Sequence, residues 1–345
     1  MFFNNYDLEK MVPGDHVLRK FKERLPVTEI AEKREEWKQC LGREGYGMEA
    51  GLRALFLQFW GDYSDREMEE QLRYNFSYRW FCDFKMEDRT PDHTFFSRVR
   101  KNMGAERIEE LFQRIVKDAE LRKVIKKLES FVDASAIRRK EAEWAKRDEE
   151  KRKEEEEIKE GLKGREKKEF NQKAQMGQTR GNHAKPGTFS ADKQARWGCK
   201  RERKYWFGYK RHVSMDLGSG LIERVAATPA NVNDSDGFKL VCPWGKKVIA
   251  DKGYDAATVR GTMMDRGCED GVLRRNNRKD YDAARNKILS KRRSPGERVF
   301  SKMDKRTRYM GLAKTYLQVL MEAIVHNLKR LAVLEGPIPL VIGTA

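Results

Sequence analysis

The sequence lacks long hydrophobic runs and any stretch typical of a targeting signal. No apolar segment approaches the ~20 residues with which a helix crosses a bilayer. The start, Met1–Asp7, has no basic region followed by an apolar run, as a signal peptide would have. These absences argue against a membrane-spanning or secreted protein, and we expect a cytoplasmic one.

Cysteine is sparse as well. The chain has 5 cysteines among 345 residues. No two of them form a Cys-x-x-Cys pair, which argues against a zinc site built from thiolates. Because their number is odd and they are scattered, we predict reduced thiols rather than a disulfide framework.

Charged side chains are abundant, and basic residues predominate. They make up 37% of the chain, so part of it must be a solvated charged segment. The 39% of hydrophobic residues still permits a globular core, and the net charge of +18 attracts polyanions. Charge favours a nucleic acid as partner, but it does not separate a general basic protein from a nucleic-acid enzyme.

Helical spacing of apolar residues dominates the first third of the chain. Ser64 with Glu67 forms a capping box, which predicts the start of one helix. Pro91 is expected at the first position of another helix, and a further helix is expected around Ile108. We predict an all-helical N-terminal domain over residues 1–120.

The composition changes abruptly after residue 137. Lys, Arg and Glu dominate as far as about residue 173, and Glu–Lys pairs at i,i+4 spacing can hold a helix without a core. We predict a charged helical insertion ending in a flexible loop, together residues 138–190. A solvated arm or helical hairpin is favoured over a dedicated DNA-gripping element.

Period-two alternation around this insertion predicts an α/β domain formed by residues 121–137 and 191–335, followed by a tail at 336–345. The expected strands are 129–137, 204–216, 221–227, 246–250 and 271–275; the expected helices are a short one capped at 234–236, then 255–266, 294–304 and 308–335. By analogy this order matches an RNase H-like core, a mixed sheet with flanking helices.

Two aspartates lie in or directly after predicted strands, at positions that indicate a ligand site. Asp133 lies inside an apolar strand, on the same face as Phe131, and a buried carboxylate there needs a cation or an ion-pair partner. Asp251 directly follows a strand, where ligands gather in α/β sheets. The alternatives are an Asp–Arg pair for Asp133 and a turn-forming role for Asp251.

Glu297 has a competing structural explanation. Ser294-Pro295-Gly296-Glu297 reads as a helix start, with Ser294 as the cap and Glu297 closing a capping box. The two roles need not exclude each other, because one carboxylate oxygen can meet the backbone while the other binds a metal.

Three carboxylates from separate elements suit phosphodiester chemistry. In-line displacement at phosphorus is assisted by two divalent ions about 4 Å apart, which stabilise the attacking and leaving oxygens. Mg²⁺ prefers hard oxygen ligands. Asp133, Asp251 and Glu297 are therefore candidates for such a site, with the alternative structural roles still open.

Longer motifs accompany these residues. They are Tyr63-Ser64-Asp65-Arg66-Glu67, Thr90-Pro91-Asp92-His93-Thr94, Val132-Asp133-Ala134, Gly208-Tyr209-Lys210-Arg211-His212, Thr228-Pro229-Ala230-Asn231-Val232-Asn233-Asp234, Ala250-Asp251-Lys252-Gly253-Tyr254, and Arg293 with Glu297. Together they resemble the insertion-sequence transposases that have an Asp-Asp-Glu (DDE) active site, a short helical N-terminal domain and an RNase H-like catalytic domain. The resemblance covers about residues 46–335 apart from the charged segment.

The resemblance implies a transposase that binds the terminal inverted repeats of its element, cleaves at the ends and joins the 3′-OH ends to target DNA. It assigns two Mg²⁺ ions, with Mn²⁺ as a substitute, to Asp133, Asp251 and Glu297. It assigns a phosphate contact to Arg293. The alternative is a catalytically inactive, transposase-derived DNA-binding protein.

The closing motif departs from that of some relatives. A Tyr that precedes the arginine in those relatives is Ser290 here, and a Lys that follows their glutamate is Asp304, with Lys302 and Lys305 as neighbours. Glu322 on the last predicted helix is the alternative third carboxylate.

Basic residues beside aromatics predict a surface that follows a DNA backbone. The expected DNA contacts are Arg293, Lys302, Lys305, Lys210, Arg211, His212, Arg98 and Arg100. For His212, a buried histidine with satisfied hydrogen bonds is the simpler interpretation. We expect double-stranded DNA as partner, a homodimer or higher oligomer on it, and a nucleoid-associated protein.

Overall fold

The computed structural model describes residues 7–31, 46–126, 128–139, 192–199 and 205–334, together with 160–164, 166 and 169. Most of the charged insertion predicted at 138–190, and the basic residues of 200–204, lie outside this description. The chain forms two compact units. The first comprises residues 1–126, 218–223 and 320–345, and the second 127–217 and 224–319.

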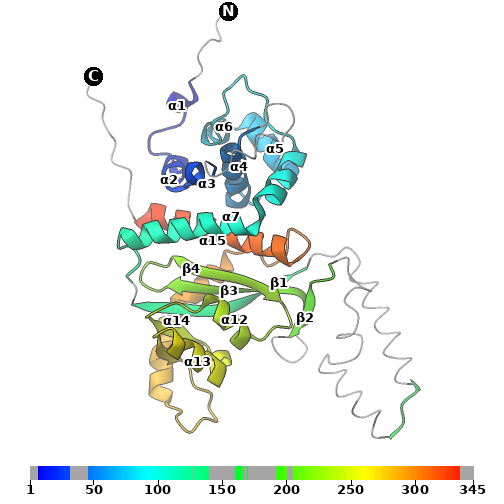
Figure 1. Cartoon of the computed structure of the whole chain (residues 1–345), viewed down its shortest axis with the longest axis vertical. Coiled ribbons are helices and arrows are strands. Elements are labelled where there is room, and N and C mark those ends of the chain that lie inside the picture. Colours follow the sequence, from blue (N-terminus) through cyan, green and yellow to red (C-terminus); the bar gives the residue numbers. More distant parts are fainter. Residues whose placement is uncertain are drawn as a thin grey trace, which may run out of the picture. The chain divides into compact units, whose positions relative to one another are not determined.

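Helices build the first unit (Figure 1). They are α1 (Leu8–Met11), α2 (Val17–Arg24), α3 (Val27–Ala31), α4 (Met48–Trp60), α5 (Asp65–Tyr74), α6 (Phe76–Phe81), α7 (His93–Leu121) and the second part of α15 (Leu312–Leu334). α4 lies at the centre, since 10 of its 13 residues are buried. Its Phe56 ring lies 5.4 Å from that of Phe21 and 5.6 Å from that of Phe81.

The capping box predicted for α5 is confirmed. Ser64 Oγ accepts a hydrogen bond from the Glu67 N–H at 3.3 Å, and the Glu67 carboxylate accepts one from the Ser64 N–H at 2.7 Å. Two N–H groups at the start of the helix are thereby satisfied by side chains.

The predicted start of α7 is wrong in one detail. Asp92 caps this helix by accepting from the Thr94 N–H at 2.9 Å, so Pro91 lies before the helix instead of at its first position. The two helices expected on either side of residue 104 are present within α7, separated at Gly104, whose φ of 64° and ψ of 174° are not helical. Glycine adopts that conformation at little cost.

A six-stranded mixed sheet builds the second unit. Its strands are β1 (Glu129–Arg138), β2 (Arg196–Cys199), β3 (Tyr205–Asp216), β4 (Ile222–Pro229), β5 (Lys247–Ala250) and β6 (Glu269–Val272). Their order is β2-β3-β1-β5-β6, and β4 also pairs with β3. β3 runs antiparallel to β1, whereas β5 and β6 run parallel to it. β2 was not predicted, because four residues are too few for an alternation signal.

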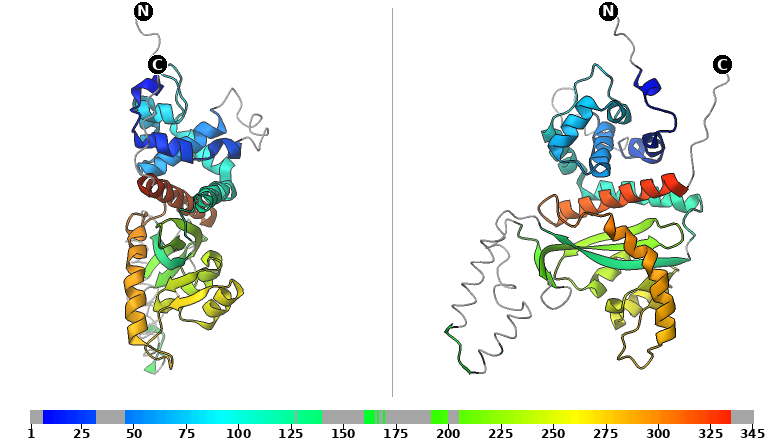
Figure 2. Two further views of the ribbon diagram at one scale, coloured as in Figure 1. Left: turned by 90° about the vertical axis from the view of Figure 1, so that its left-hand side faces the viewer. Right: turned by 180° about the vertical axis from the view of Figure 1, so that it is seen from behind.

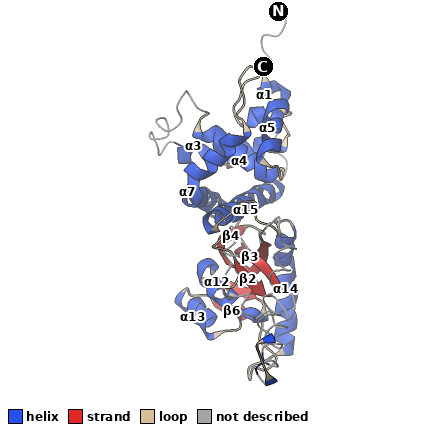
Figure 3. Cartoon of the chain, turned by 90° about the vertical axis from the view of Figure 1, so that its right-hand side faces the viewer, coloured by secondary structure: helices blue, strands red, loops and turns tan. Residues whose placement is uncertain are grey.

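Helices cover both faces of this sheet (Figures 2 and 3). α12 (Asp234–Val241) and α13 (Ala257–Asp265) lie on one face and share a buried cluster with Val132, Val248 and Ala250. α14 (Ala283–Ser301) crosses the other face, where Phe131 contacts it. The alternation of side chains along β1 therefore separates Val132 from Phe131 and Asp133.

α14 starts well before the predicted position. Asp282 is its N-cap and accepts from the Ala284 N–H at 2.8 Å, so Ser294 and Pro295 lie inside the helix. The capping-box interpretation of Glu297 is therefore wrong. Pro295 removes one N–H donor and its ring crowds the carbonyl of Lys291, which costs the helix about 3 kcal/mol, yet α14 continues through it.

None of the helices in the described ranges combines the length and the apolar run that crossing a membrane requires.

Candidate active site

Asp133 and Asp251 come from two neighbouring parallel strands. Val132 on β1 pairs with Ala250 on β5, so the next residue of each strand is an aspartate at the same edge of the sheet. Asp133 is half-buried within β1, and Asp251 is half-buried just past the end of β5. The point where β5 ends beside the middle of β1 thus brings together two acidic residues.

The turn-forming alternative for Asp251 is also realised. Its carboxylate accepts from the Lys252 N–H at 2.7 Å and caps the short helix η2 (Lys252–Tyr254). This hydrogen bond occupies one carboxylate oxygen and fixes the side chain, while 50% of the side chain stays exposed.

α14 approaches the sheet closely enough to bring Glu297 beside this edge. A Cβ atom built on Gly296 would lie 2.3 Å from Cδ1 of Phe131, so only glycine fits where the helix meets β1. Glu297 follows directly, and 52% of its side chain is exposed.

Arg293 joins two of the three acidic residues. Its guanidinium lies 3.3 Å from Asp251 Oδ1 and also forms an ion pair with Glu297, one helical turn further on. The Arg293 side chain is only 17% exposed. Asp251 and Glu297 therefore belong to one site, although they lie far apart in the sequence.

Tyr254 belongs to the same site and was not singled out from the sequence. Its side chain is 2% exposed, and its hydroxyl has no hydrogen-bond partner among the described residues. Burial, together with the carboxylates of Asp133, Asp234 and Asp251, raises the pKa of Tyr254 well above its ordinary value. The only sequence signal for Tyr254 was its place in the motif that starts at Ala250.

The chemistry of these donors fits a divalent cation. Asp133, Asp251 and Glu297 offer the hard oxygen atoms that Mg²⁺ prefers, and Arg293 compensates only part of their negative charge. In the described ranges no three acidic, histidine or cysteine side chains converge closely enough to hold an ion.

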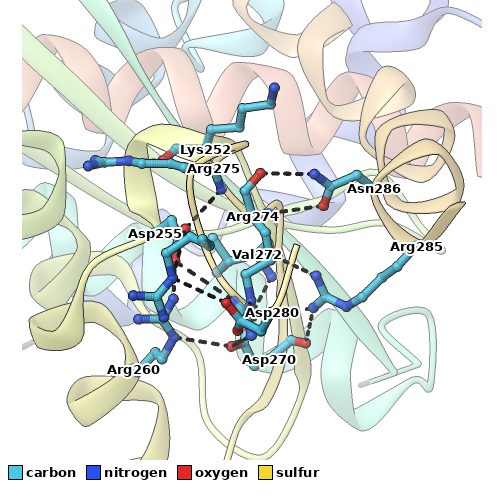
Figure 4. A network of polar contacts seen from close by, with 11 residues as sticks. Lys252, Asp255, Arg260, Asp270, Val272, Arg274, Arg275, Asp280, Arg285 and Asn286 are labelled. Atoms are coloured by element: carbon cyan, nitrogen blue, oxygen red, sulfur yellow. Dashed lines mark hydrogen bonds and ion pairs between the residues drawn. The ribbon is translucent and has the colours of Figure 1, made fainter. Parts of the chain in front are cut away.

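An ion-pair network fixes the connection between Asp251 and α14 (Figure 4). The buried Asp255 carboxylate accepts from the Arg275 N–H at 2.9 Å and pairs with Arg260. Arg274 pairs with Asp270 at 2.9 Å, and its backbone is held by Asn286 at the start of α14. The network links η2, β6 and α14, so it limits how far the acidic edge and α14 can separate.

Two of the predicted DNA contacts are buried. Arg211 is 1% exposed and donates to the Asp304 carbonyl at 2.9 Å. His212 is fully buried, with Nε2 2.9 Å from Thr228 Oγ1 and its ring against Gly237. Neither side chain reaches a surface on which DNA would lie. His212 is the buried histidine of the simpler interpretation, but its hydrogen bonds are only half satisfied, because Nδ1 has no partner among the described residues.

The other predicted contacts divide into paired and exposed side chains. Lys210 is 2.8 Å from Asp234, and Arg100 forms a two-point ion pair with Asp65 at 2.6 and 2.8 Å. Arg98, Lys302 and Lys305 are exposed. Of the residues predicted to contact DNA, these three have side chains that are exposed in the structure.

The alternative carboxylate, Glu322, is half-buried on α15. It lies in the part of α15 that belongs to the first unit, whereas Asp133, Asp251 and Glu297 all lie in the second.

We expect the buried His212 to make folding sensitive to mild acid. Burial lowers the pKa of His212 from 6.5 to about 4. The unfolded chain therefore takes up a proton that the folded chain refuses, and stability falls as the pH drops from 6.5 towards 4. The loss between pH 7 and pH 5 should be about 2 kcal/mol, measured by urea unfolding.

His212→Gln should remove most of that dependence, since glutamine does not titrate. His93→Gln, which removes a histidine from the first unit, is the matched control. An equal pH dependence in wild type and His212→Gln would contradict this account.

Comparison with known proteins agrees with this geometry. Residues 126–328 match the family described as "Transposase DDE domain", and residues 6–102 match "Transposase domain (DUF772)". The first match spans more than half of the chain, so the chain belongs to the DDE transposases of insertion sequences. The family inferred from the sequence motifs is thereby confirmed.

One relative is the transposase for insertion sequence element IS1106 of Neisseria meningitidis serogroup B. It is 34% identical over 157 residues, which are 42% of this chain and 54% of the relative. The chain thus spans about half the length of this curated relative. The cryo-EM structure of the piggyBac transposase synaptic complex with hairpin DNA shares 11% identity and a TM-score of 0.36, covering 94% of this chain and 74% of that one. Such a TM-score does not define a common fold.

Proposed function

We propose that the protein is an active DNA transposase. It binds the terminal inverted repeats of its element, cleaves at the ends by two-metal phosphodiester hydrolysis and joins the 3′-OH ends to target DNA. The observation that carries the proposal is the pairing of Val132 with Ala250, which sets Asp133 beside Asp251, together with the Arg293 bridge from Asp251 to Glu297.

Strand order supports an RNase H-like catalytic domain. β4, β3 and β1 form the antiparallel part, and β5 and β6 continue it in the parallel sense. Ligand sites in such mixed sheets lie at the carboxyl ends of strands. Asp251 has that location at the end of β5, and Asp133 lies beside it in the middle of β1.

The chain's own residues have separate tasks in this mechanism. Asp133, Asp251 and Glu297 would hold the cations, either Mg²⁺ or Mn²⁺. Two bound divalent ions would stabilise the attacking and leaving oxygens during displacement at phosphorus. Arg293, once released from Asp251 and Glu297, would contact a phosphate, for which its planar guanidinium is well suited.

Exposed basic residues would extend the contact with DNA beyond the acidic centre. We assign this role to Lys302 and Lys305, which follow α14, and to Arg98 on α7. The helical domain of residues 1–120 would bind the DNA ends or dimerise. Because two ends are processed together, a homodimer or higher oligomer on DNA is expected.

The test is cleavage and joining of DNA that carries the element's own terminal repeats, with Mg²⁺ or Mn²⁺. Wild type should yield joined products, whereas Asp133→Ala and Asp251→Ala should yield none while still binding the ends. Binding of the ends by wild type without any cleavage would point instead to an inactive transposase-derived DNA-binding protein. Cleavage without joining would indicate a nuclease.

A further inference from the structure

Two cysteines meet where α12 and α13 end on one face of the sheet (Figure 3). Cys242 is the C-cap of α12, and Cys268 follows the end of α13. Both thiols donate to the Pro243 carbonyl oxygen, at 3.5 Å from Cys242 Sγ and 3.1 Å from Cys268 Sγ. Cys268 also packs against the apolar cluster that contains Cys242. The two sulfur atoms therefore lie close together at one carbonyl, although β5 and α13 separate them in the sequence.

The local backbone fixes the position of Cys268. The Gly267 φ of 62° is left-handed, a conformation that glycine adopts at little cost. The Gly267 N–H donates to the Met264 carbonyl at 3.0 Å, and the Cys268 N–H donates to the Met263 carbonyl at 2.8 Å. These two hydrogen bonds form the Schellman motif that ends a helix. Cys268 is therefore held against the last turn of α13.

Arg266 joins this end of α13 to the end of α12. Its guanidinium donates to the Lys239 carbonyl at 2.8 Å and to the Cys242 carbonyl. The last carbonyls of a helix lack partners within it, so a cation is favourable there. The Arg266 carbonyl in turn accepts from the Gly245 N–H at 2.9 Å. The two helix ends, and with them the two cysteines, are thus held together before any reaction.

The two thiols differ in their access to solvent. Cys268 is half-buried, whereas Cys242 is fully buried. Burial raises the pKa of Cys242 to about 12, and the neighbouring Cys268 thiol raises it further through its charge and a hydrogen bond. The thiolate is the reactive form of cysteine, and buried thiols are inert. A dissolved oxidant therefore reacts first with Cys268.

We propose that Cys242 and Cys268 are a reversible oxidation site, which forms a disulfide when the protein meets hydrogen peroxide. Cys268 is the thiol that reacts with the peroxide, and Cys242 is the thiol that resolves the product. Because neither cysteine belongs to the acidic site, this inference does not depend on the proposed function.

The reaction has two steps. The Cys268 thiolate attacks one peroxide oxygen, so an S–O bond forms and the O–O bond breaks, and the hydroxide released takes up the Cys268 proton as water. The Cys242 sulfur then attacks the sulfur of the Cys268 sulfenic acid. An S–S bond forms, the S–O bond breaks, and the departing hydroxide takes up the Cys242 proton as a second water. Two electrons pass from the thiols to the peroxide.

Peroxide treatment of the full, DNA-free chain tests the proposal. Cys199→Ser is the background, because Cys199 is an exposed cysteine on β2 that would also react. After brief treatment with hydrogen peroxide, the chain should lose two thiols and the mass of two hydrogens. A digest without reductant should contain one pair of peptides linked through Cys242 and Cys268. Dithiothreitol should restore both thiols.

Two variants in this background assign the two steps. In Cys242→Ala, Cys268 should oxidise beyond the sulfenic acid, so its peptide gains oxygen and no linked pair forms. In Cys268→Ala, Cys242 should stay reduced under the same treatment, and its oxidation there would contradict the assigned order.

Three results with both cysteines present would overturn the proposal. They are a Cys268 thiol that survives the treatment, Cys268 sulfinic acid that accumulates beside reduced Cys242, and a disulfide that joins Cys268 to a different cysteine.

Discussion

Glu297→Gln is expected to reduce metal-dependent cleavage of the element's ends by at least about 10³-fold, because several kcal/mol of transition-state stabilisation depend on a complete set of metal ligands. Glutamine keeps the size of the side chain and removes its charge. Since Glu297 is exposed on α14 and caps no helix, the fold should not change. Cleavage rates at saturating Mg²⁺, with end binding measured in parallel, check this result.

Glu322→Gln is the matched comparison, since it makes the same change at the alternative third carboxylate. It should keep cleavage within a few-fold of wild type, because Arg293 ties Glu297, and not Glu322, to Asp251. Activity that survives Glu297→Gln and disappears in Glu322→Gln would transfer the third ligand to Glu322. It would leave Glu297 as no more than the partner of Arg293.

Gly296→Ala is expected to destabilise the α/β unit by about 1–3 kcal/mol, the usual cost of overpacking a core. The new Cβ would lie 2.3 Å from Cδ1 of the fully buried Phe131, so α14 or the strand must shift. The same shift displaces Glu297 and Arg293 from the acidic edge, and activity should fall with stability. Urea unfolding measures the first effect and end cleavage the second.

Gly261→Ala provides the opposite result as a control. Gly261 lies inside α13 with nothing within 4 Å of its added Cβ, so alanine should stabilise by about 0.5–1 kcal/mol through helix propensity. Combining Gly296→Ala with Phe131→Val, which removes the clashing ring, should cost less than the sum of the single changes. Additive costs would show that the close approach at Gly296 is not the cause.

Local sequence patterns were sufficient to predict β1 and β5, the strands that position Asp133 and Asp251. The strand expected at 129–137 is β1, and the strand expected at 246–250 is β5, each within one residue at either end. Alternating or continuous apolar residues report burial directly, so such strands are visible in one sequence. The sequence did not predict that the two strands pair; the parallel pairing of Val132 with Ala250 in the structure sets Asp133 beside Asp251.

The start of α14 could not be predicted in the same way. Ser294-Pro295-Gly296-Glu297 has every local feature of a helix start, yet Asp282 caps a helix that passes through it. Tertiary packing decides here, because contact with Phe131 and the network around Asp270 and Arg274 stabilise a longer helix. A local start signal is worth only about 1 kcal/mol, which such contacts readily outweigh.

Sequence by itself determined the family, the two-part division into helices and a mixed sheet, and the strands that carry or precede the two aspartates, because these depend on motifs and short-range periodicity. Only the tertiary structure decided which side chains meet. It buried Arg211 and His212, paired Lys210 and Arg100 within the fold, joined Asp251 to Glu297 through Arg293, and enclosed the Tyr254 side chain. The charges and the polar–apolar alternation along one strand do not specify which helix or strand packs against it, because that element is distant in the sequence.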